Sequence, residues 1–261
     1  MEWLCKERPV LPVTAVVFDF DGTISTLRCG WEMVMEPLMV ELLGEDSIST
    51  VRKYIDESTG LQTIFQMRWL AEQMNARNPS AGYDPWMLKA EYNCRLMVSV
   101  EQRRQSILDG RLKPADFLIA GSRELLEMLT ERRVSLYAAS GTDDADVKQE
   151  AAVLGVRDFF AGIKGAPKGR ADCSKEAVIR NLIGQRGISG DRLAVVGDGK
   201  VEIAIGRENS ARTLGVASDE QALSGVNLIK RERLVKAGAD AITGDFLNKT
   251  ELSEFFFGGA A

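Results

Sequence analysis

Short apolar runs recur along the chain and alternate with longer segments whose apolar positions follow helical spacing. Six of these runs predict buried strands of a parallel sheet. They span residues 15–20, 134–140, 159–165, 192–198, 211–218 and 239–246. Segments of helical length lie between most of them, including 121–133, 143–154 and 173–185. This alternation indicates crossover units and therefore predicts an α/β fold with a doubly wound parallel sheet.

The alternation breaks between the first and the second predicted strand. Only helical patterns occur there, over residues 31–43, 47–57, 61–76 and 85–108. This insertion, from about residue 27 to residue 116, is far longer than one crossover connection needs. We expect it to fold as a separate helical module over the carboxyl edge of the sheet, where open α/β sheets bind ligands. Within it, residues 75–85 predict a loop, and Pro37 is expected to kink or divide the first helix.

Composition agrees with this picture and narrows the possible partners. The chain has 261 residues, of which 45% are hydrophobic, and this suits one well-buried α/β domain with a smaller companion. Its formal net charge of −5 provides no basic field, so we expect no nucleic-acid partner. No run approaches the ~18 apolar residues of a membrane span, and the N-terminus lacks a signal pattern, so we expect no membrane partner.

Cysteine and histidine usage excludes several kinds of chemistry. The 4 cysteines lie far apart without a CxxC pair and the chain has no histidine, so neither a zinc site nor a disulfide framework is expected. This usage fits a reducing compartment, and we expect a cytoplasmic protein. The lack of histidine also excludes Ser-His-Asp, Cys-His and HExxH catalysis. Carboxylates, lysine, hydroxyls and metal must perform any chemistry.

Two carboxylates end the first predicted strand, in the sequence VVFDFDGTIS (16–25). Asp19 and Asp21 lie two positions apart, so in extended chain their side chains point the same way. Two like charges at close range favour either a bound divalent ion or one raised pKa, and both suit catalysis. Gly22 allows a sharp backbone turn directly after them, and Thr23 can anchor that turn through its hydroxyl.

Matching polar groups follow two later strands. Ser140 and Gly141 close the second predicted strand just before a helix, which predicts a small anion-binding site. Asp198 closes the fourth predicted strand, and Glu202 follows one helical turn later. Their oxygens could together hold a hard cation.

A lysine near a helix start is the fourth feature. In ADCSKEAVI (171–179), Asp172 is expected to cap a helix whose first turn contains Lys175. A cation there opposes the helix dipole by ~0.3–1 kcal/mol, which is understandable if an anion lies nearby. A phosphate group would be such an anion.

In chain order, these four features resemble the four motifs of the haloacid dehalogenase superfamily in its phosphatase branch. The matching residues are DFDGT (19–23), Ser140, Lys175, and Asp198 with Glu202. The resemblance covers a core domain of residues 1–26 and 116–261. The insertion, residues 27–115, is similar to the helical cap domain of that superfamily.

The resemblance implies roles for the carboxylates. Asp19 would be the nucleophile that takes the phosphoryl group, while Asp21 would protonate the leaving oxygen and then deprotonate the attacking water. Mg²⁺ would be held by Asp19, Asp198 and the Asp21 carbonyl, with Glu202 holding a metal-bound water. Members that cleave carbon–halogen bonds lack the second aspartate of the first motif, so Asp21 favours phosphate esters.

The same resemblance implies that the phosphate oxygens meet Gly22, Ser140, Gly141 and Lys175 beside Asp19. Substrate contacts are also expected from the insertion.

Residues 56–63 (DESTGLQT) form a polar joint between two predicted helices of the insertion. Its candidates for substrate contact are Thr59, Gly60, Gln62 and Thr63. Arg28, just after the first motif, is a further candidate for a substrate anion.

Together these features predict a Mg²⁺-dependent phosphomonoester hydrolase acting on a small phosphorylated metabolite, such as a sugar phosphate or phosphoglycolate. A sugar-phosphate mutase is an alternative on the same scaffold. A phosphonate hydrolase would need a cap lysine, and neither Lys53 nor Lys89 lies in the polar joint. A non-enzymatic module that binds phosphorylated ligands is the alternative of a different class. The sequence leaves the substrate and the oligomeric state open.

Overall fold

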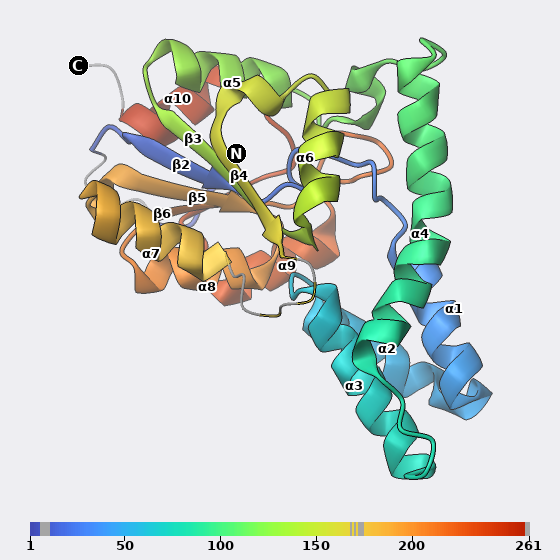
Figure 1. The fold of residues 1–261 in the computed structure, drawn as a ribbon. Coiled ribbons are helices and arrows are strands. Elements are labelled where there is room, and N and C mark those ends of the chain that lie inside the picture. The colour runs from blue at the N-terminus through green and yellow to red at the C-terminus, as the bar shows by residue number, and fades with distance from the viewer. Residues whose placement is uncertain (6–10, 168, 170, 172–174, 259–261) are drawn as a thin grey trace.

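A single sheet forms the centre of the protein, with helices on both faces and a further group of helices beside its carboxyl edge (Figure 1). The computed structural model describes residues 1–5, 11–167, 169, 171 and 175–258. Within these residues the strands are β1 (Glu2–Trp3), β2 (Ala15–Phe18), β3 (Ser135–Asp143), β4 (Phe160–Ala166), β5 (Leu193–Gly197), β6 (Arg212–Val216) and β7 (Ala241–Thr243). Their order is β1-β7-β6-β5-β2-β3-β4, and all neighbours are parallel except β1 and β7. This is the α/β class expected from the sequence.

β2 lies in the middle of the sheet, between β3 and β5, where the strand order reverses. Its Phe18 is in register with Ala138 of β3 and with Val196 of β5. The residues that follow these three strands therefore meet at one edge, and Asp19 and Asp198 are among them. Open parallel sheets bind their ligands at such a point.

Six helices cover the two faces of the sheet (Figure 1). On one face lie α5 (Ser122–Glu131), α6 (Asp144–Val153) and α10 (Lys249–Phe257), and on the other α7 (Lys175–Arg186), α8 (Lys200–Glu208) and α9 (Leu228–Ala237). Short 3-10 helices connect elements at η2 (Pro114–Phe117), η3 (Arg157–Phe159) and η4 (Gly190–Arg192). Successive side chains of β2 point to opposite faces of the sheet. Val16 and Phe18 pack in the apolar cluster of α5 and α10, whereas Ala15 and Val17 pack in that of α7 and α8. None of the described helices has both the length and the apolar character to cross a membrane.

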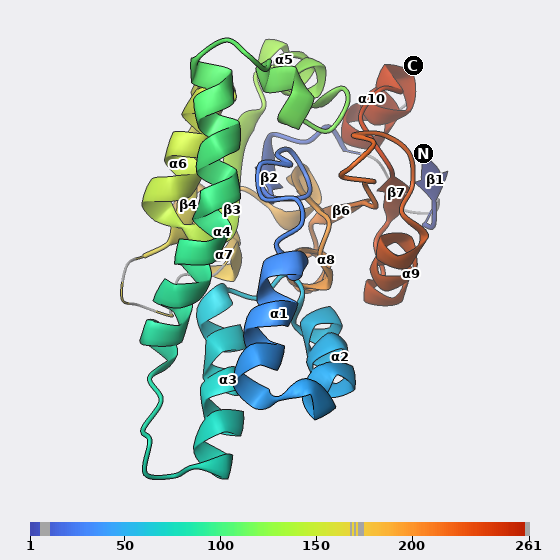
Figure 2. The same cartoon turned by 90° about the vertical axis from the view of Figure 1, so that its right-hand side faces the viewer.

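The insertion between β2 and β3 contains four helices that pack on one another. They are α1 (Glu32–Leu43), α2 (Ile48–Ser58), α3 (Thr63–Arg77) and α4 (Pro85–Leu108), with a short η1 (Glu45–Ser47). Leu38, Met67 and Leu70 are fully buried in an apolar cluster that these helices share. α4 extends from this group alongside α6 (Figure 2). The two connections to the sheet lie side by side, because the Thr26 amide donates to the Phe117 carbonyl at 2.9 Å.

The six strands predicted from the sequence are confirmed with shifted ends, and the last is much shorter than predicted, since β7 covers three of residues 239–246. β1 was missed, because two residues are too short to show a pattern. α1 continues through Pro37, so this proline does not divide the helix, and the alternative that it kinks the helix stays a prediction. The carbonyl left without its usual donor belongs to Met33, which is 80% exposed, so water can bond to it. The first two positions of the helix predicted over 173–185 lie outside the described residues.

Candidate active site

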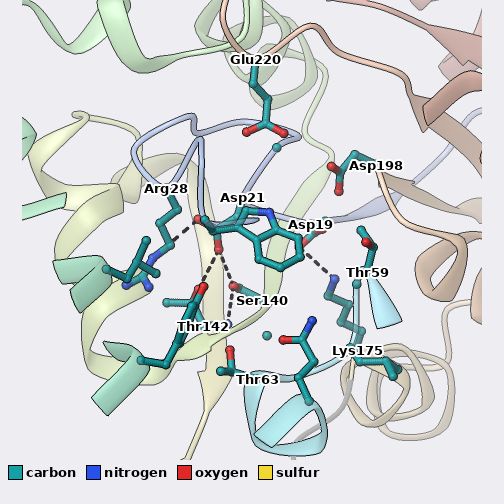
Figure 3. A pocket seen from close by; sticks show the side chains of 18 residues that line it. Asp19, Asp21, Arg28, Thr59, Thr63, Ser140, Thr142, Lys175, Asp198 and Glu220 are labelled. Atoms are coloured by element: carbon teal, nitrogen blue, oxygen red, sulfur yellow. Dashed lines mark hydrogen bonds and ion pairs between the residues drawn. The ribbon is translucent and has the colours of Figure 1, made fainter. Parts of the chain in front are cut away.

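A cavity of about 120 Å³ lies between the carboxyl edge of the sheet and the helices of the insertion (Figure 3). The sheet side contributes Asp19, Asp21, Gly22, Ser140, Gly141, Thr142, Lys175, Asp198 and Glu220. The insertion and its first connection contribute Arg28, Trp31, Thr59, Gly60, Leu61, Thr63, Gln66, Tyr92 and Leu96. The cavity thus joins acidic and hydroxyl groups of the sheet to a wall that is mostly uncharged.

Asp19 follows β2 directly and is only 6% exposed. Its Oδ1 accepts hydrogen bonds from the Phe20 amide at 2.8 Å and from the Lys175 ammonium at 3.1 Å. Burial raises the pKa of Asp19 to about 7; Lys175 opposes this rise, whereas the charges of Asp198 and Asp21 add to it. All three carboxylates line the same cavity.

Asp21 is held by two hydroxyl groups of β3. Ser140 Oγ and Thr142 Oγ1 donate to Asp21 Oδ2 at 3.0 and 2.9 Å (Figure 3). The other oxygen, Oδ1, is buried without a hydrogen-bond partner in the described part of the chain, and Arg28 Nε lies 4.0 Å from it. Asp21 therefore has one oxygen fixed by hydroxyl groups and one that accepts no hydrogen bond from the described residues. The contribution of Thr142 was not predicted, although it follows Ser140 by two positions and so faces the same way.

Lys175 is the first residue of α7 and is shared between two carboxylates. Besides Asp19, its ammonium contacts Glu202 of α8. Glu202 is 1% exposed and does not line the cavity, so it reaches the site through Lys175. Its expected part in holding a metal-bound water stays a prediction. Asp172, expected to cap this helix, lies outside the described residues.

Asp198 follows β5 and is bonded by a lysine that the sequence did not indicate. Lys230 of α9 donates to Asp198 Oδ2 at 2.8 Å and to Glu220 Oε1 at 2.6 Å. Burial by itself would lower the pKa of Lys230, but Asp198 and Glu220 outweigh it and the pKa is raised. Glu220 follows the predicted strand 211–218, so the rule that carboxyl ends of strands meet at one edge could have identified it.

Gly22 permits the close approach of the first and fourth motifs. Its φ is +73°, and a Cβ atom there would lie 2.3 Å from Asp198 Oδ2. The carbonyl of Gly22 accepts a hydrogen bond from Ser218 at 2.6 Å, which fixes the turn. Any residue with a side chain at this position would displace Asp198.

The acidic residues fit a hard divalent cation. Asp19 and Asp198 line one cavity with Asp21, so three carboxylates face one space. Carboxylate and carbonyl oxygens are the ligands that Mg²⁺ prefers, and it usually retains several waters. Among the described residues, no three acidic, histidine or cysteine side chains are gathered closely enough to bind a metal by themselves. A metal here would therefore need backbone and water ligands as well.

The polar joint of the insertion reaches the cavity. Thr59, Gly60 and Thr63 line it, whereas Gln62 does not, although the Gln62 Cα lies only 3.6 Å from where a Cβ of Gly141 would be. The sequence did not indicate the further lining residues Trp31, Leu61, Gln66, Tyr92 and Leu96. For the helical residues among them, periodicity shows which positions are apolar or buried but not which ones meet a cavity.

Arg28 lines the cavity but is bonded mainly to α6. Its guanidinium lies 2.6 Å from Glu150 Oε1 and 3.4 Å from Asp146 Oδ2. Glu150 is fully buried, and burial, opposed by the charge of Arg28, raises the pKa of Glu150 to about 7. The positive charge of Arg28 is therefore largely balanced by the protein. Its role as a substrate contact stays a prediction.

Comparison with known proteins adds a family and a set of structural relatives. A sequence model of the haloacid dehalogenase-like hydrolases matches residues 13–209. A search of curated proteins gave no match.

Several solved structures share the fold at low sequence identity. A predicted phosphoglycolate phosphatase from Haemophilus somnus 129PT has a TM-score of 0.63 and 13% identity, over 92% of this chain and 98% of that chain. A β-phosphoglucomutase from Clostridium difficile has a TM-score of 0.62 and 16% identity, over 94% and 97%. A predicted phosphatase from Clostridium acetobutylicum has a TM-score of 0.58 and 18% identity, over 93% and 99%. At these identities the likeness concerns the fold.

Proposed function

Because the chain belongs to the haloacid dehalogenase-like hydrolases, we propose that it is a Mg²⁺-dependent phosphatase that hydrolyses a small phosphorylated metabolite. Hydrolases of this family generally use a divalent metal. One observation carries the proposal: a single cavity is lined by Asp19, Asp21, Ser140, Lys175 and Asp198. Phosphoryl transfer depends mainly on charge neutralisation and in-line positioning, and this set of groups is suited to both.

Asp19 is the proposed nucleophile. One of its oxygens attacks the phosphorus of the ester, the bond from phosphorus to the leaving oxygen breaks, and an aspartyl-phosphate forms. Lys175 lies 3.1 Å from Asp19, so its ammonium would neutralise charge on the carboxylate and on the phosphoryl oxygens. The contact of Lys175 with Glu202 supports this role, because it fixes the ammonium in place.

Asp21 is the proposed acid and base. Ser140 and Thr142 occupy its Oδ2, which leaves Oδ1 for proton transfer. A proton on Oδ1 would pass to the leaving oxygen in the first step. In the second step the same oxygen would take a proton from the attacking water, which releases phosphate and restores Asp19.

Asp19, Asp198 and the backbone carbonyl of Asp21 would hold Mg²⁺. When bound, the ion would neutralise the carboxylates and the transferring phosphoryl group. The phosphate oxygens would meet Ser140, Lys175 and the backbone of residues 22 and 141. This arrangement accounts for the crowding of acidic groups at one edge of the sheet.

Residues 27–115 are proposed to form a cap domain over a core domain of residues 1–26 and 116–261. Their separate apolar cluster and their two adjacent connections support this division. Closure of the cap would exclude water during phosphoryl transfer, and reopening would release the product. Thr59, Gly60 and Thr63 are the proposed cap contacts to the substrate, because they line the cavity.

Phosphonate hydrolysis gains no support from the cap lysines. Lys53 has an exposed side chain, and Lys89 is bonded to Asp143. Lys175 is the only lysine among the described lining residues. An imine with the substrate would require a lysine that reaches the substrate carbon, and no cap lysine described here does so.

Hydrolysis of p-nitrophenyl phosphate with Mg²⁺ tests the proposal. We expect turnover in the wild type, none after chelation, and none in Asp19→Asn, because an amide cannot attack phosphorus. Asp109→Asn is the matched control and should retain full activity, because Asp109 lies in an exposed turn after α4 and is not among the residues that line the cavity. Full activity in Asp19→Asn would contradict the assignment of the nucleophile.

A panel of phosphorylated metabolites then separates the remaining alternatives. Free phosphate is expected from a small sugar phosphate or from phosphoglycolate. An isomeric sugar phosphate without free phosphate would instead identify a mutase. Tight binding of phosphorylated ligands without turnover of any of them would identify a binding module.

A further inference from the structure

A cluster of charges lies beside the proposed metal ligand Asp198. We call it the Lys230 cluster, and it consists of Asp198, Ser218, Glu220 and Lys230. The Lys230 ammonium donates to Asp198 Oδ2 at 2.8 Å, to Glu220 Oε1 at 2.6 Å and to Ser218 Oγ at 3.3 Å. The side chains of Lys230, Asp198 and Glu220 are 14%, 14% and 16% exposed, so these contacts are well shielded from water.

The cluster fixes one oxygen of Asp198 and leaves the other without a protein donor. Oδ2 is turned toward Lys230 and also toward Gly22, where a Cβ would lie 2.3 Å from it. In the described part of the chain, no residue donates a hydrogen bond to Oδ1. Ser218 links the cluster to the first motif, because its hydroxyl donates to the Gly22 carbonyl.

We propose that the positive charge of Lys230 neutralises the carboxylate of Asp198 when no metal is bound, and that the same charge weakens the binding of a divalent ion to Asp198. The inference rests on the proposed function, because it assumes that Asp198 is a metal ligand. Lys230 is a positioning residue in this role. It acts on the metal through Asp198 and does not touch the substrate.

The direction of the effect follows from Coulomb's law. A divalent ion on Asp198 would lie near the ammonium of Lys230, and two positive charges at that range in a shielded site repel each other. Glu220 has the opposite effect, because it offsets the charge of Lys230. Removing Lys230 should therefore tighten metal binding, whereas removing the charge of Glu220 should weaken it.

Calorimetric titration of the full-length protein with MgCl2 tests these opposite signs. In Lys230→Met we expect Mg²⁺ to bind roughly three- to tenfold more tightly, and in Glu220→Gln more weakly by a similar factor. Lys230→Arg keeps the charge and should return the affinity toward that of the wild type. Lys236→Met is the matched control, because Lys236 lies on the same helix, is 74% exposed and, among the described residues, forms an ion pair with Glu232 alone; the Mg²⁺ affinity of this variant should be unchanged.

Thermal unfolding in the presence of a chelator gives a second readout. Lys230→Met should melt at a lower temperature than the wild type, because Asp198 and Glu220 then repel each other. Added Mg²⁺ should raise its Tm by more than it raises that of the wild type.

The outcomes separate this inference from the function on which it rests. A purely structural role for Lys230 would weaken metal binding in both variants, so weaker or unchanged affinity in Lys230→Met overturns the inference. If that variant does not fold, Lys230→Gln, which removes the charge but keeps a hydrogen-bond donor, decides: tighter binding supports the inference, and unchanged or weaker binding overturns it. A wild type that hydrolyses phosphate esters while Lys230→Met binds Mg²⁺ more weakly would leave the proposed function standing. A wild type that binds no divalent ion would overturn both.

Discussion

At the scale of single residues, the three aspartates of the site share one pattern. Asp19 has one oxygen bonded to the Phe20 amide and Lys175, Asp21 has one bonded to hydroxyls, and Asp198 has one bonded to Lys230. Among the described residues, the second oxygen of each accepts no hydrogen bond. Each carboxylate is thus oriented by the protein through one oxygen, which is consistent with the proposed roles of nucleophile, acid and metal ligand. Pre-oriented groups of this kind are what phosphoryl transfer requires.

Thr142→Val tests the orientation of Asp21. It removes the hydroxyl that donates to Asp21 Oδ2 at 2.9 Å and keeps the side-chain volume. We expect kcat to fall about ten- to hundredfold, because a hydrogen bond to a charged group contributes ~1.5–3 kcal/mol, and KM to change less, because the lost bond is made to Asp21. Steady-state kinetics measure both constants. Thr130→Val is the control, since its hydroxyl bonds to a helix carbonyl in α5. Equal kcat values in the two variants would refute a role for Thr142.

Gly22→Ala tests the close approach of Asp198. The new Cβ would lie 2.3 Å from Asp198 Oδ2, and the positive φ is strained for alanine. We expect the free energy of unfolding to fall by about 1–3 kcal/mol. Gly141→Ala is the matched control, because a Cβ there meets no atom nearer than 3.6 Å and stability should barely change. Urea unfolding measures both, and equal stabilities would show that the turn at residue 22 can relax.

At the scale of elements, buried or shielded ion pairs connect the insertion to the sheet. Arg28, in the connection between β2 and α1, is bonded to Glu150 of α6. Lys89 of α4 contacts Asp143 at the end of β3, and Asn93 donates to the same carboxylate at 3.0 Å. These contacts place the insertion against the strand that also carries Ser140. They hold the insertion residues that line the cavity at a defined position relative to the carboxyl edge of the sheet.

Glu150→Ala should be strongly destabilising. It leaves the buried guanidinium of Arg28 without its main partner, and removing one member of a buried pair costs about 3 kcal/mol or more. Glu36→Ala is the control, because its pair with Arg52 at 2.8 Å is exposed and such pairs contribute about 0–1 kcal/mol. Urea unfolding gives both values. Similar losses in the two variants would mean that water replaces Glu150 at Arg28.

At the scale of the whole molecule, the chain leaves and re-enters the sheet at one place. Ser25 forms an antiparallel bridge with Leu118, and the Thr26 amide bonds to Phe117. The helices between them share their own apolar cluster. If the insertion is a cap, as proposed, these two adjacent connections would serve as its hinge, and closure would have to preserve or exchange the contacts to α6 and β3.

Excision of residues 27–115 tests this division of the molecule. A short Gly-Ser linker should join residues 26 and 116, because the neighbouring backbone atoms of Thr26 and Phe117 are 2.9 Å apart. We expect the shortened protein to unfold cooperatively and to lose most turnover, since water is no longer excluded from the cavity. Circular dichroism and thermal unfolding measure the first effect. An unfolded or aggregated product would contradict the proposed core domain.

Several features of this protein were determined by local sequence alone. Apolar runs such as 15–20 and 192–198 predicted the strands, because burial on both faces leaves a continuous pattern. Since parallel strands end at a common edge, the polar residues after those runs predicted that Asp19 and Asp198 would meet. The helical insertion was equally visible, because its period differs from that of the strands.

Only the tertiary structure decided which partner holds each charged group. Arg28 and Glu150 lie 122 positions apart, and Asp198 and Lys230 lie 32 apart on elements that no local pattern connects. Helical periodicity likewise showed that Trp31 and Tyr92 are apolar positions, but not that they face a cavity. Such contacts depend on how helices and strands pack against one another, and a periodic pattern records burial without recording the neighbour. The sequence therefore determined the edge at which the acidic groups gather, and the packing determined which oxygen of each remains free.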